Sequence, residues 1–143
     1  MGMHEFAKHI LAVADQRNLS CSNLQLQKVM YFAIKDYLDD HPGEDGLSFV
    51  KEMYDLPFKT WDYGPLIPSI YHEYGIYGNT SIPENGTYQE KYKDFDQYIA
   101  NRLNKDIFDL VKESHQQPLW SNNQKEILNR SNTFNYRIED IVE

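Results

Sequence analysis

The sequence has a single cysteine, Cys21, and lacks any long run of apolar residues. One cysteine excludes an intramolecular disulfide and is typical of proteins in a reducing cytosol. His4, Glu5 and Lys8 interrupt the apolar stretch that a signal peptide needs. No segment approaches the roughly 20 apolar residues that cross a bilayer. We therefore expect a cytoplasmic protein that has no membrane partner.

Positive charge is also scarce. The chain has 14 Lys and Arg against 22 Asp and Glu, which gives a net charge of −8. This balance disfavours binding to phosphate backbones or anionic membranes. The 11 tyrosines could stack on bases, but nucleic-acid platforms combine aromatic rings with a positive groove. We expect no nucleic-acid partner, and a basic protein fits the charge better.

Patterns typical of cofactor and metal sites are missing as well. The seven glycines do not have the spacing of a phosphate-binding loop, and the five histidines do not have that of metal ligands. We expect no cofactor, no metal and no catalytic set. If the chain were an unrecognised enzyme, the candidate residues would be Cys21, His72 and His115.

The length of 143 residues is typical of one domain with one core. Apolar residues at spacings of three and four predict a helix over 4–17. Ser22 to Gln25 has the form of a capping box and introduces a second helix that runs to about Leu38. The expected fold is mainly α, a compact single domain over 1–143 with about five to six helices and at most a small β-hairpin.

Turn-forming residues predict loops at 39–46 and 78–86. Between them, 47–61 is irregular, and any strand there is short or at an edge because of Pro57. Gly64 can adopt a backbone conformation that other residues avoid, and Pro65 suits the first position of a helix that ends at Gly75.

The last third of the chain again has helical periodicity. It predicts helix over 89–114, divided at Asn104 and ended by Pro118. Ser121 to Gln124 resembles a second capping box before a short helix, and 138–142 form a last short turn.

Aromatic and proline residues are dense between Tyr54 and Tyr77. Tyr and Trp combine large apolar area with a polar group and are enriched where proteins meet. Trp61, Tyr63 and Tyr71 therefore either fill the core of a small domain or form a protein-binding surface. The residue pattern leaves both interpretations open.

Three stretches carry a further signal when taken together. Residues 23–33 read NLQLQKVMYFA, residues 61–71 read WDYGPLIPSIY, and residues 115–120 read HQQPLW. They resemble the N-L-x-L-Q-K-L-L-Y-F-A, W-x-Y-G-P-V-V-P-x-x-Y and H-x-x-x-P-W motifs of the Panacea domain. That family includes SocA-like antitoxins and many phage-associated proteins. In the third stretch, Leu119 separates Pro118 from Trp120.

The resemblance implies a mainly α-helical domain that neutralises a toxin by direct protein binding, and it implies no catalytic set. The leading hypothesis is a prophage-associated antitoxin-like protein with a cognate toxin, basic in charge, as its partner. One relative delivers its toxin to the ClpXP protease. One alternative is therefore a proteolytic adaptor with a ClpXP-type protease as a second partner, and the other is an unrecognised phage-encoded enzyme.

The motif residues also predict a site. From the polar edge of the second helix, the Gln27 and Lys28 side chains would reach the backbone of the 61–65 turn, and Tyr31 would close over it. Either the motif only fixes how this turn packs, or the turn presents aromatic anchors to a toxin. The candidate motif and partner-binding residues are Gln27, Lys28, Tyr31, Trp61, Tyr63, Gly64, Pro65, Tyr71, His115 and Trp120.

Overall fold

The computed structural model describes residues 2–143, and the helix α2 (Asn23–Asp40) runs through its middle. The predicted capping box is confirmed. The Ser22 hydroxyl accepts the Gln25 backbone N–H, and the Gln25 side chain accepts the Ser22 N–H. These bonds satisfy backbone donors that a helix start otherwise leaves unpaired. Most residues of α2 are buried, because other elements cover it on several sides.

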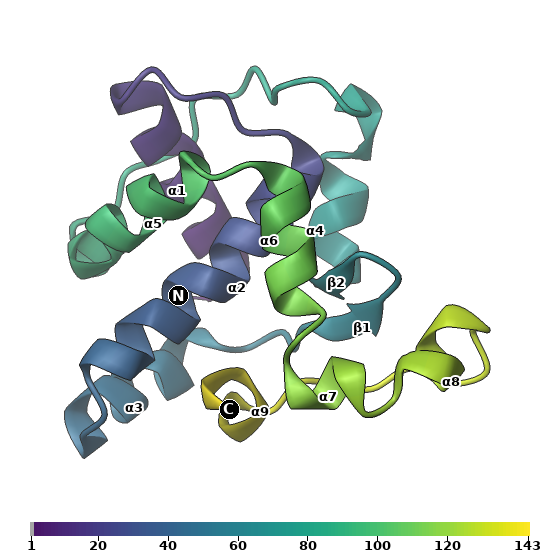
Figure 1. The fold of residues 1–143 in the computed structure, drawn as a ribbon. Helices are drawn as coiled ribbons and strands as arrows, with labels where there is room; N and C mark the ends of the chain where they lie inside the picture. Colours follow the sequence, from purple (N-terminus) through teal and green to yellow (C-terminus); the bar gives the residue numbers. More distant parts are fainter. Residues whose placement is uncertain (1) are drawn as a thin grey trace.

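Helix α1 (Met3–Gln16) precedes α2, and its predicted apolar face is buried. Figure 1 shows α1 and α5 on one side of α2, and α4 and α6 on the other. The elements after α2 are α3 (Glu44–Met53), β1 (Lys59–Trp61), β2 (Gly64–Leu66), α4 (Pro68–Glu73), the 3-10 helices η1 (Gly75–Tyr77) and η2 (Glu90–Phe95), α5 (Asp96–Leu103), α6 (Ile107–Ser114), α7 (Pro118–Ser121), α8 (Gln124–Leu128) and α9 (Ile138–Val142).

The mainly α fold with one small hairpin is confirmed. Residues 2–143 contain nine α-helices rather than five or six. The stretch predicted as 89–114 consists of η2, α5 and α6, and the break at Asn104 is confirmed. The predicted loop at 78–86 contains no helix or strand.

Helix α3 was predicted as loop and irregular chain, which is wrong. Gly43 is its N-cap, and Glu44 and Asp45 occupy its first turn. Carboxylates there favour a helix because they face the positive end of its dipole. Gly46 is buried against the His41 carbonyl, where a Cβ atom would come within 2.5 Å of the oxygen. The acidic and glycine-rich sequence therefore encodes a helix start.

Pro68 and Pro118 begin helices, whereas the sequence predicts Pro65 at a helix start and Pro118 at a helix end. Pro65 lies in β2, and Pro68 begins α4. Pro118 begins α7 instead of only ending the helix before it. Ser121 belongs to α7, and the N-cap of α8 is Asn123, whose side chain makes no capping bond. The second predicted capping box is therefore wrong.

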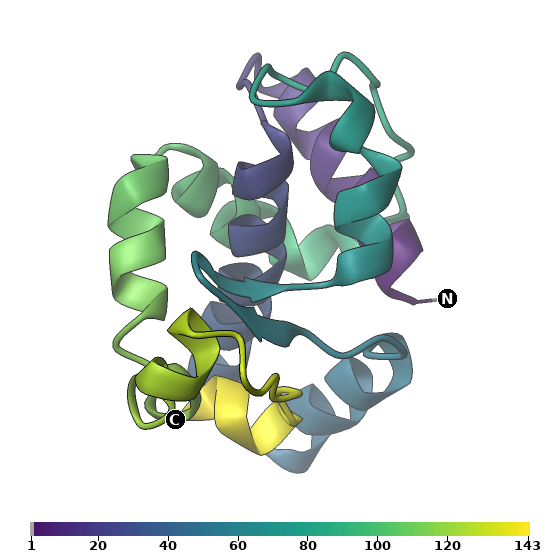
Figure 2. The ribbon, with the colours of Figure 1, turned by 90° about the vertical axis from the view of Figure 1, so that its right-hand side faces the viewer.

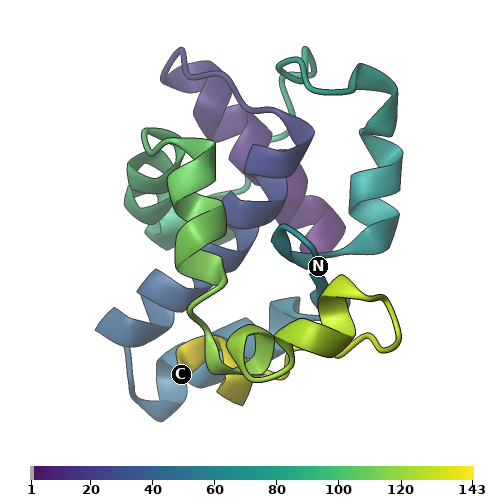
Figure 3. The same cartoon turned by 45° about the vertical axis from the view of Figure 1, so that its right-hand side comes forward.

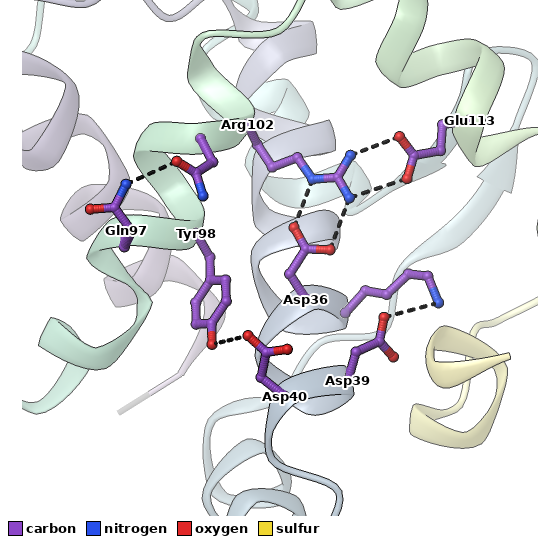
Figure 4. A network of polar contacts seen from close by, with 9 residues as sticks. Asp36, Asp39, Asp40, Gln97, Tyr98, Arg102 and Glu113 are labelled. Atoms are coloured by element: carbon purple, nitrogen blue, oxygen red, sulfur yellow. Dashed lines mark hydrogen bonds and ion pairs between the residues drawn. The ribbon is translucent and has the colours of Figure 1, made fainter.

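The buried apolar residues form one core, with members from Met3 to Ile141. A polar network at its edge connects three helices (Figure 4). The Arg102 guanidinium on α5 makes paired bonds of 2.7 to 3.1 Å to Asp36 of α2 and Glu113 of α6. It also lies 4.2 Å from the centre of the Phe32 ring. Within residues 2–143, none of the helices has both the length and the apolar character needed to cross a membrane.

The capping box at the start of α2 gives a direct test of this helix. Replacement Ser22→Ala removes the acceptor for the Gln25 N–H and should lower the free energy of unfolding by about 1 kcal/mol. Urea denaturation measures the change. Ser20→Ala, at an exposed position just before, is the matched control and should leave stability unchanged. Equal stability of both variants would contradict the role of the cap.

Candidate partner-binding site

The site is built on the β1–β2 hairpin. The two strands are antiparallel, and Trp61 pairs with Gly64, so the turn consists of Asp62 and Tyr63. The outer edge of β1 is also paired. The Thr60 N–H donates to the Phe134 carbonyl over 2.9 Å. A strand that is paired on both edges is held more firmly than an isolated hairpin, which is marginally stable in water.

Gly64 lies where the hairpin approaches α2 and α6 most closely. Its backbone φ is +101°, in a region that residues with a Cβ atom rarely adopt. A Cβ atom at Gly64 would lie 2.2 Å from the Ser114 Oγ and 3.2 Å from the Lys28 Cε. Figure 2 shows the turn of the hairpin directed towards α6. Glycine is thus required here by backbone conformation and by space.

Two side chains of α2 hold the hairpin and the residues after it. The Lys28 Nζ donates a 2.8 Å hydrogen bond to the Pro65 carbonyl. The Gln27 Oε1 accepts the Ile67 backbone N–H over 2.8 Å. Both side chains are completely buried, so they do not lie at a polar helix edge. The sequence prediction that they reach this backbone is confirmed for Lys28, and Gln27 binds two residues further along.

Lys28 has an unusual environment for a lysine. Burial lowers the pKa of its amine from 10.5 to about 7, because the charged form loses its hydration. Within residues 2–143, no carboxylate forms an ion pair with it. The neutral amine can still donate to the Pro65 carbonyl, so the bond does not need the charge.

The third motif binds two further carbonyls of the same hairpin. The His115 Nε2 lies 2.8 Å from the Asp62 carbonyl oxygen, and the Trp120 Nε1 donates to the Trp61 carbonyl over 2.8 Å. A carbonyl only accepts, so His115 carries its hydrogen on Nε2. The two rings are stacked with centroids 3.7 Å apart. Burial lowers the pKa of His115, and the charge on Lys28 lowers it further. The extra residue before Trp120 does not prevent this contact.

Three aromatic side chains lie together on the outer side of the hairpin, Trp61 and Tyr63 from the hairpin and Tyr71 from α4, and we call them the aromatic corner. The Trp61 ring centroid lies 5.2 Å from that of Tyr63 and 5.1 Å from that of Tyr71. Tyr63, at the tip of the turn, is 49% exposed, and the other two are partly buried. Figure 3 shows α7 and α8 below the hairpin, away from α4, which carries Tyr71.

Hollows lie on two sides of the aromatic corner, and both are lined in part by Trp61 and Tyr71. One, of about 770 Å³, extends to Ile76 on η1, which is 85% exposed. The other, of about 410 Å³, extends to Phe108 on α6, which is 71% exposed. Sequence reasoning missed both apolar residues. Phe108 could have been noticed because it lies outside the apolar stripe of its helix.

Tyr31 is the candidate residue that the structure places elsewhere. It is completely buried, and its ring contacts Phe32, Phe58 and Tyr136 in the core. It supports the hairpin through Phe58, just before β1, and does not close over the turn. The structure brings the other candidate residues together around the hairpin, on its inner or its outer side.

The three candidate residues for catalysis have separate environments. Cys21 is buried, which raises the pKa of its thiol to about 12 and disfavours the nucleophilic thiolate. His115 is bound to the Asp62 carbonyl, and His72 is exposed at the rim of a hollow. Within residues 2–143, no hydrogen bond joins any two of them, and no group of three or more potential metal ligands is found.

In comparisons with known proteins, no family model, no curated protein and no solved structure matches the chain significantly. The similarity to the Panacea motifs therefore remains an expectation from the three stretches of sequence.

Replacement Gly64→Ala tests the close approach of the hairpin to α2 and α6. The backbone of the new alanine must keep a positive φ, and its methyl group must displace the Ser114 side chain. We therefore expect a loss of about 2 to 3 kcal/mol in the free energy of unfolding. Chemical denaturation provides the measurement. Gly75→Ala is the control, because a Cβ atom there meets nothing within 4 Å. A stable Gly64→Ala protein would refute the packing described.

The buried amine of Lys28 predicts a pH dependence of stability. Between pH 7 and 10.5, Lys28 makes the folded state bind fewer protons than the unfolded state. The free energy of unfolding therefore rises with pH over this range, and this gain is lost as pH falls towards 7. The slope is at most about 1.4 kcal/mol per pH unit. Lys28→Met should remove this pH dependence. Urea unfolding of the variant and of the wild type between pH 7 and 9.5 measures the difference.

Tyrosines of the unfolded chain begin to titrate at the upper end of this interval, but both proteins contain the same tyrosines, so their effect cancels in the comparison. Lys51→Met removes an exposed lysine and serves as the control that keeps the wild-type slope. Parallel stability curves for wild type and Lys28→Met would contradict an uncompensated buried amine.

Proposed function

We propose that the protein is a cytoplasmic, prophage-associated antitoxin that neutralises a cognate toxin by binding it directly at the aromatic corner. The observation that carries the proposal is a half-exposed aromatic surface on a hairpin whose backbone is fixed from the inner side. Tyr63 is at its tip, and the Trp61 and Asp62 carbonyls behind it are both bound by side chains.

A surface held in this way is suited to protein binding. Anchor residues in protein interfaces are enriched in Trp and Tyr, and little entropy is lost when such anchors are already ordered. The hollows beside Trp61 offer places for side chains of a partner. Ile76 and Phe108 extend the apolar area on both sides. Together these features support an interface of the size that stable complexes use, roughly 1,200 to 2,000 Å².

Charge supports a basic partner. The net charge is −8, and carboxylates adjoin the apolar residues of the surface. Asp109 follows Phe108, whereas Asp62, between Trp61 and Tyr63, is paired with Arg130 over 3.2 Å. An acidic rim accelerates encounter with a basic protein and disfavours acidic ones.

The resemblance to Panacea antitoxins agrees with this arrangement. The three similar stretches are far apart in the sequence, and they meet at one hairpin. The first contributes Lys28, the second the hairpin with its aromatic corner, and the third His115 and Trp120. A motif that served only to stabilise the fold would not need Tyr63, which is half exposed and contacts Trp61 alone among the aromatic rings of residues 2–143.

The proposal is tested by co-expression with the product of the adjacent reading frame. We expect that product to arrest growth alone and to be harmless, and co-purified, when this chain is present. Tyr63→Ala and Phe108→Ala should each weaken the complex at least tenfold, and the double variant should no longer protect cells. Leu128→Ala, which removes another half-exposed apolar side chain on α8, is the matched control and should protect fully.

Toxin abundance in the same cells distinguishes the two modes of neutralisation. Neutralisation by coverage leaves the half-life of the toxin unchanged, whereas delivery to a ClpXP-type protease would shorten it. A neighbour that is not toxic and does not co-purify would refute the proposal, as would full protection by the double variant.

A further inference from the structure

A second apolar groove lies at the opposite end of α2 from its capping box. It is bordered by the end of α2, the start of α3 and α9, and has a volume of about 370 Å³. Figures 1 and 2 both show α9 beside α3 at this end of the molecule, away from α4 and the tip of the hairpin. The groove shares no residue with the two hollows beside the aromatic corner.

Four aliphatic side chains line the groove, together with His41, Pro42 and Gly43. Leu38 is buried at its base, Leu47 and Ile138 are partly buried, and Val142 is 42% exposed. Three separate elements, α2, α3 and α9, supply these side chains. It offers room for a large apolar side chain, which would cover Val142 on entering.

The rim of the groove is acidic. Asp39 and Glu139 line it and are exposed, and Glu44 and Asp45 project from the first turn of α3 beside it. Within residues 2–143, no ion pair engages Glu44 or Asp45. The nearest lysine, Lys35, is held by the Ile141 carbonyl at 3.3 Å and lies 3.8 Å from Asp39.

Lys35 and Arg137 each form an ion pair with one rim carboxylate, which leaves Glu44 and Asp45 as the uncompensated charges of the rim among residues 2–143. Arg137 lies 3.3 Å from Asp140, which is buried, and only 4.0 Å from Glu139. Arg102 is occupied by Asp36 and Glu113, as Figure 4 shows. The carboxylates in the first turn of α3 also offset the positive end of its dipole, so the groove does not suit an anion.

We propose that this groove binds a short basic peptide segment of a protein partner. A large apolar side chain of the segment fills the space between Leu47, Ile138 and Val142, and flanking Lys or Arg side chains lie against the carboxylates of the rim. Charge complementarity selects this occupant, because a basic segment neutralises the excess of carboxylates at Glu44 and Asp45, whereas an acidic segment would add to it. The proposal does not depend on the aromatic corner and applies to a separate surface.

Fluorescence anisotropy with three labelled peptides tests the proposal. The first has two leucines flanked on both sides by arginines, the second has serines in place of the leucines, and the third has glutamates in place of the arginines. We expect saturable binding of the first peptide, weakened by added salt. The serine peptide should bind at least tenfold more weakly, and the glutamate peptide should not bind.

Variants locate the binding on the molecule. Glu139→Lys and Val142→Asp alter exposed side chains of the groove and should each weaken the arginine–leucine peptide at least tenfold. Glu126→Lys on α8 makes the same charge change far from the groove and should have little effect, and Tyr63→Ala should have none. The proposal is overturned if this peptide fails to bind, if the serine peptide binds equally well, or if Glu126→Lys and Glu139→Lys weaken it equally.

Discussion

The hydrogen bond from the buried Lys28 amine to the Pro65 carbonyl is the contact on which the candidate site depends. It is made inside the protein, without an ion-pair partner, at the point where the hairpin reaches α2. If the carbonyl moved away, the buried amine would lose its acceptor, and an unpaired buried donor lowers the free energy of unfolding. The bond therefore fixes the backbone just after Gly64, and Gly64 must remain small to let the lysine stem pass.

The hairpin has two faces with different roles. On the inner face, Lys28 of α2, His115 just after α6 and Trp120 of α7 bind carbonyls of the hairpin at Pro65, Asp62 and Trp61, respectively. On the outer face, the aromatic corner is left partly exposed beside two hollows. The structural interpretation of the motif applies to the inner residues, whose hydrogen bonds hold the hairpin. The inner residues hold the turn, and the outer ones form the surface that we propose for the toxin.

Local signals in the sequence predicted much of the fold. Helical periodicity and the Ser22 capping box placed α1 and α2, and the contact between Lys28 and the turn followed from the motif. Helix α3 was missed because its acidic first turn and its glycines resemble a loop, while the close packing of Gly46 on His41 depends on tertiary structure. Ser121 was misjudged because two very short helices share its segment.

The candidate site was predictable in its residues and less so in its geometry. Sequence reasoning cannot say which tyrosine of a helix faces the core, and Tyr31 was therefore placed over the turn although it packs on Phe58. The contributions of Ile76 and Phe108 arise where η1 and α6 pass on either side of the aromatic corner. That arrangement depends on the path of the whole chain between them.

Amide hydrogen exchange of the chain, alone and in complex with the product of the adjacent reading frame, tests the central claim most directly. The account predicts that the complex gains protection over residues 61–77 and at the start of α6, while amides of α1 and α5 are unchanged. A complex in which the hairpin exchanges as it does in the free protein, with protection gained on other surfaces, would contradict it.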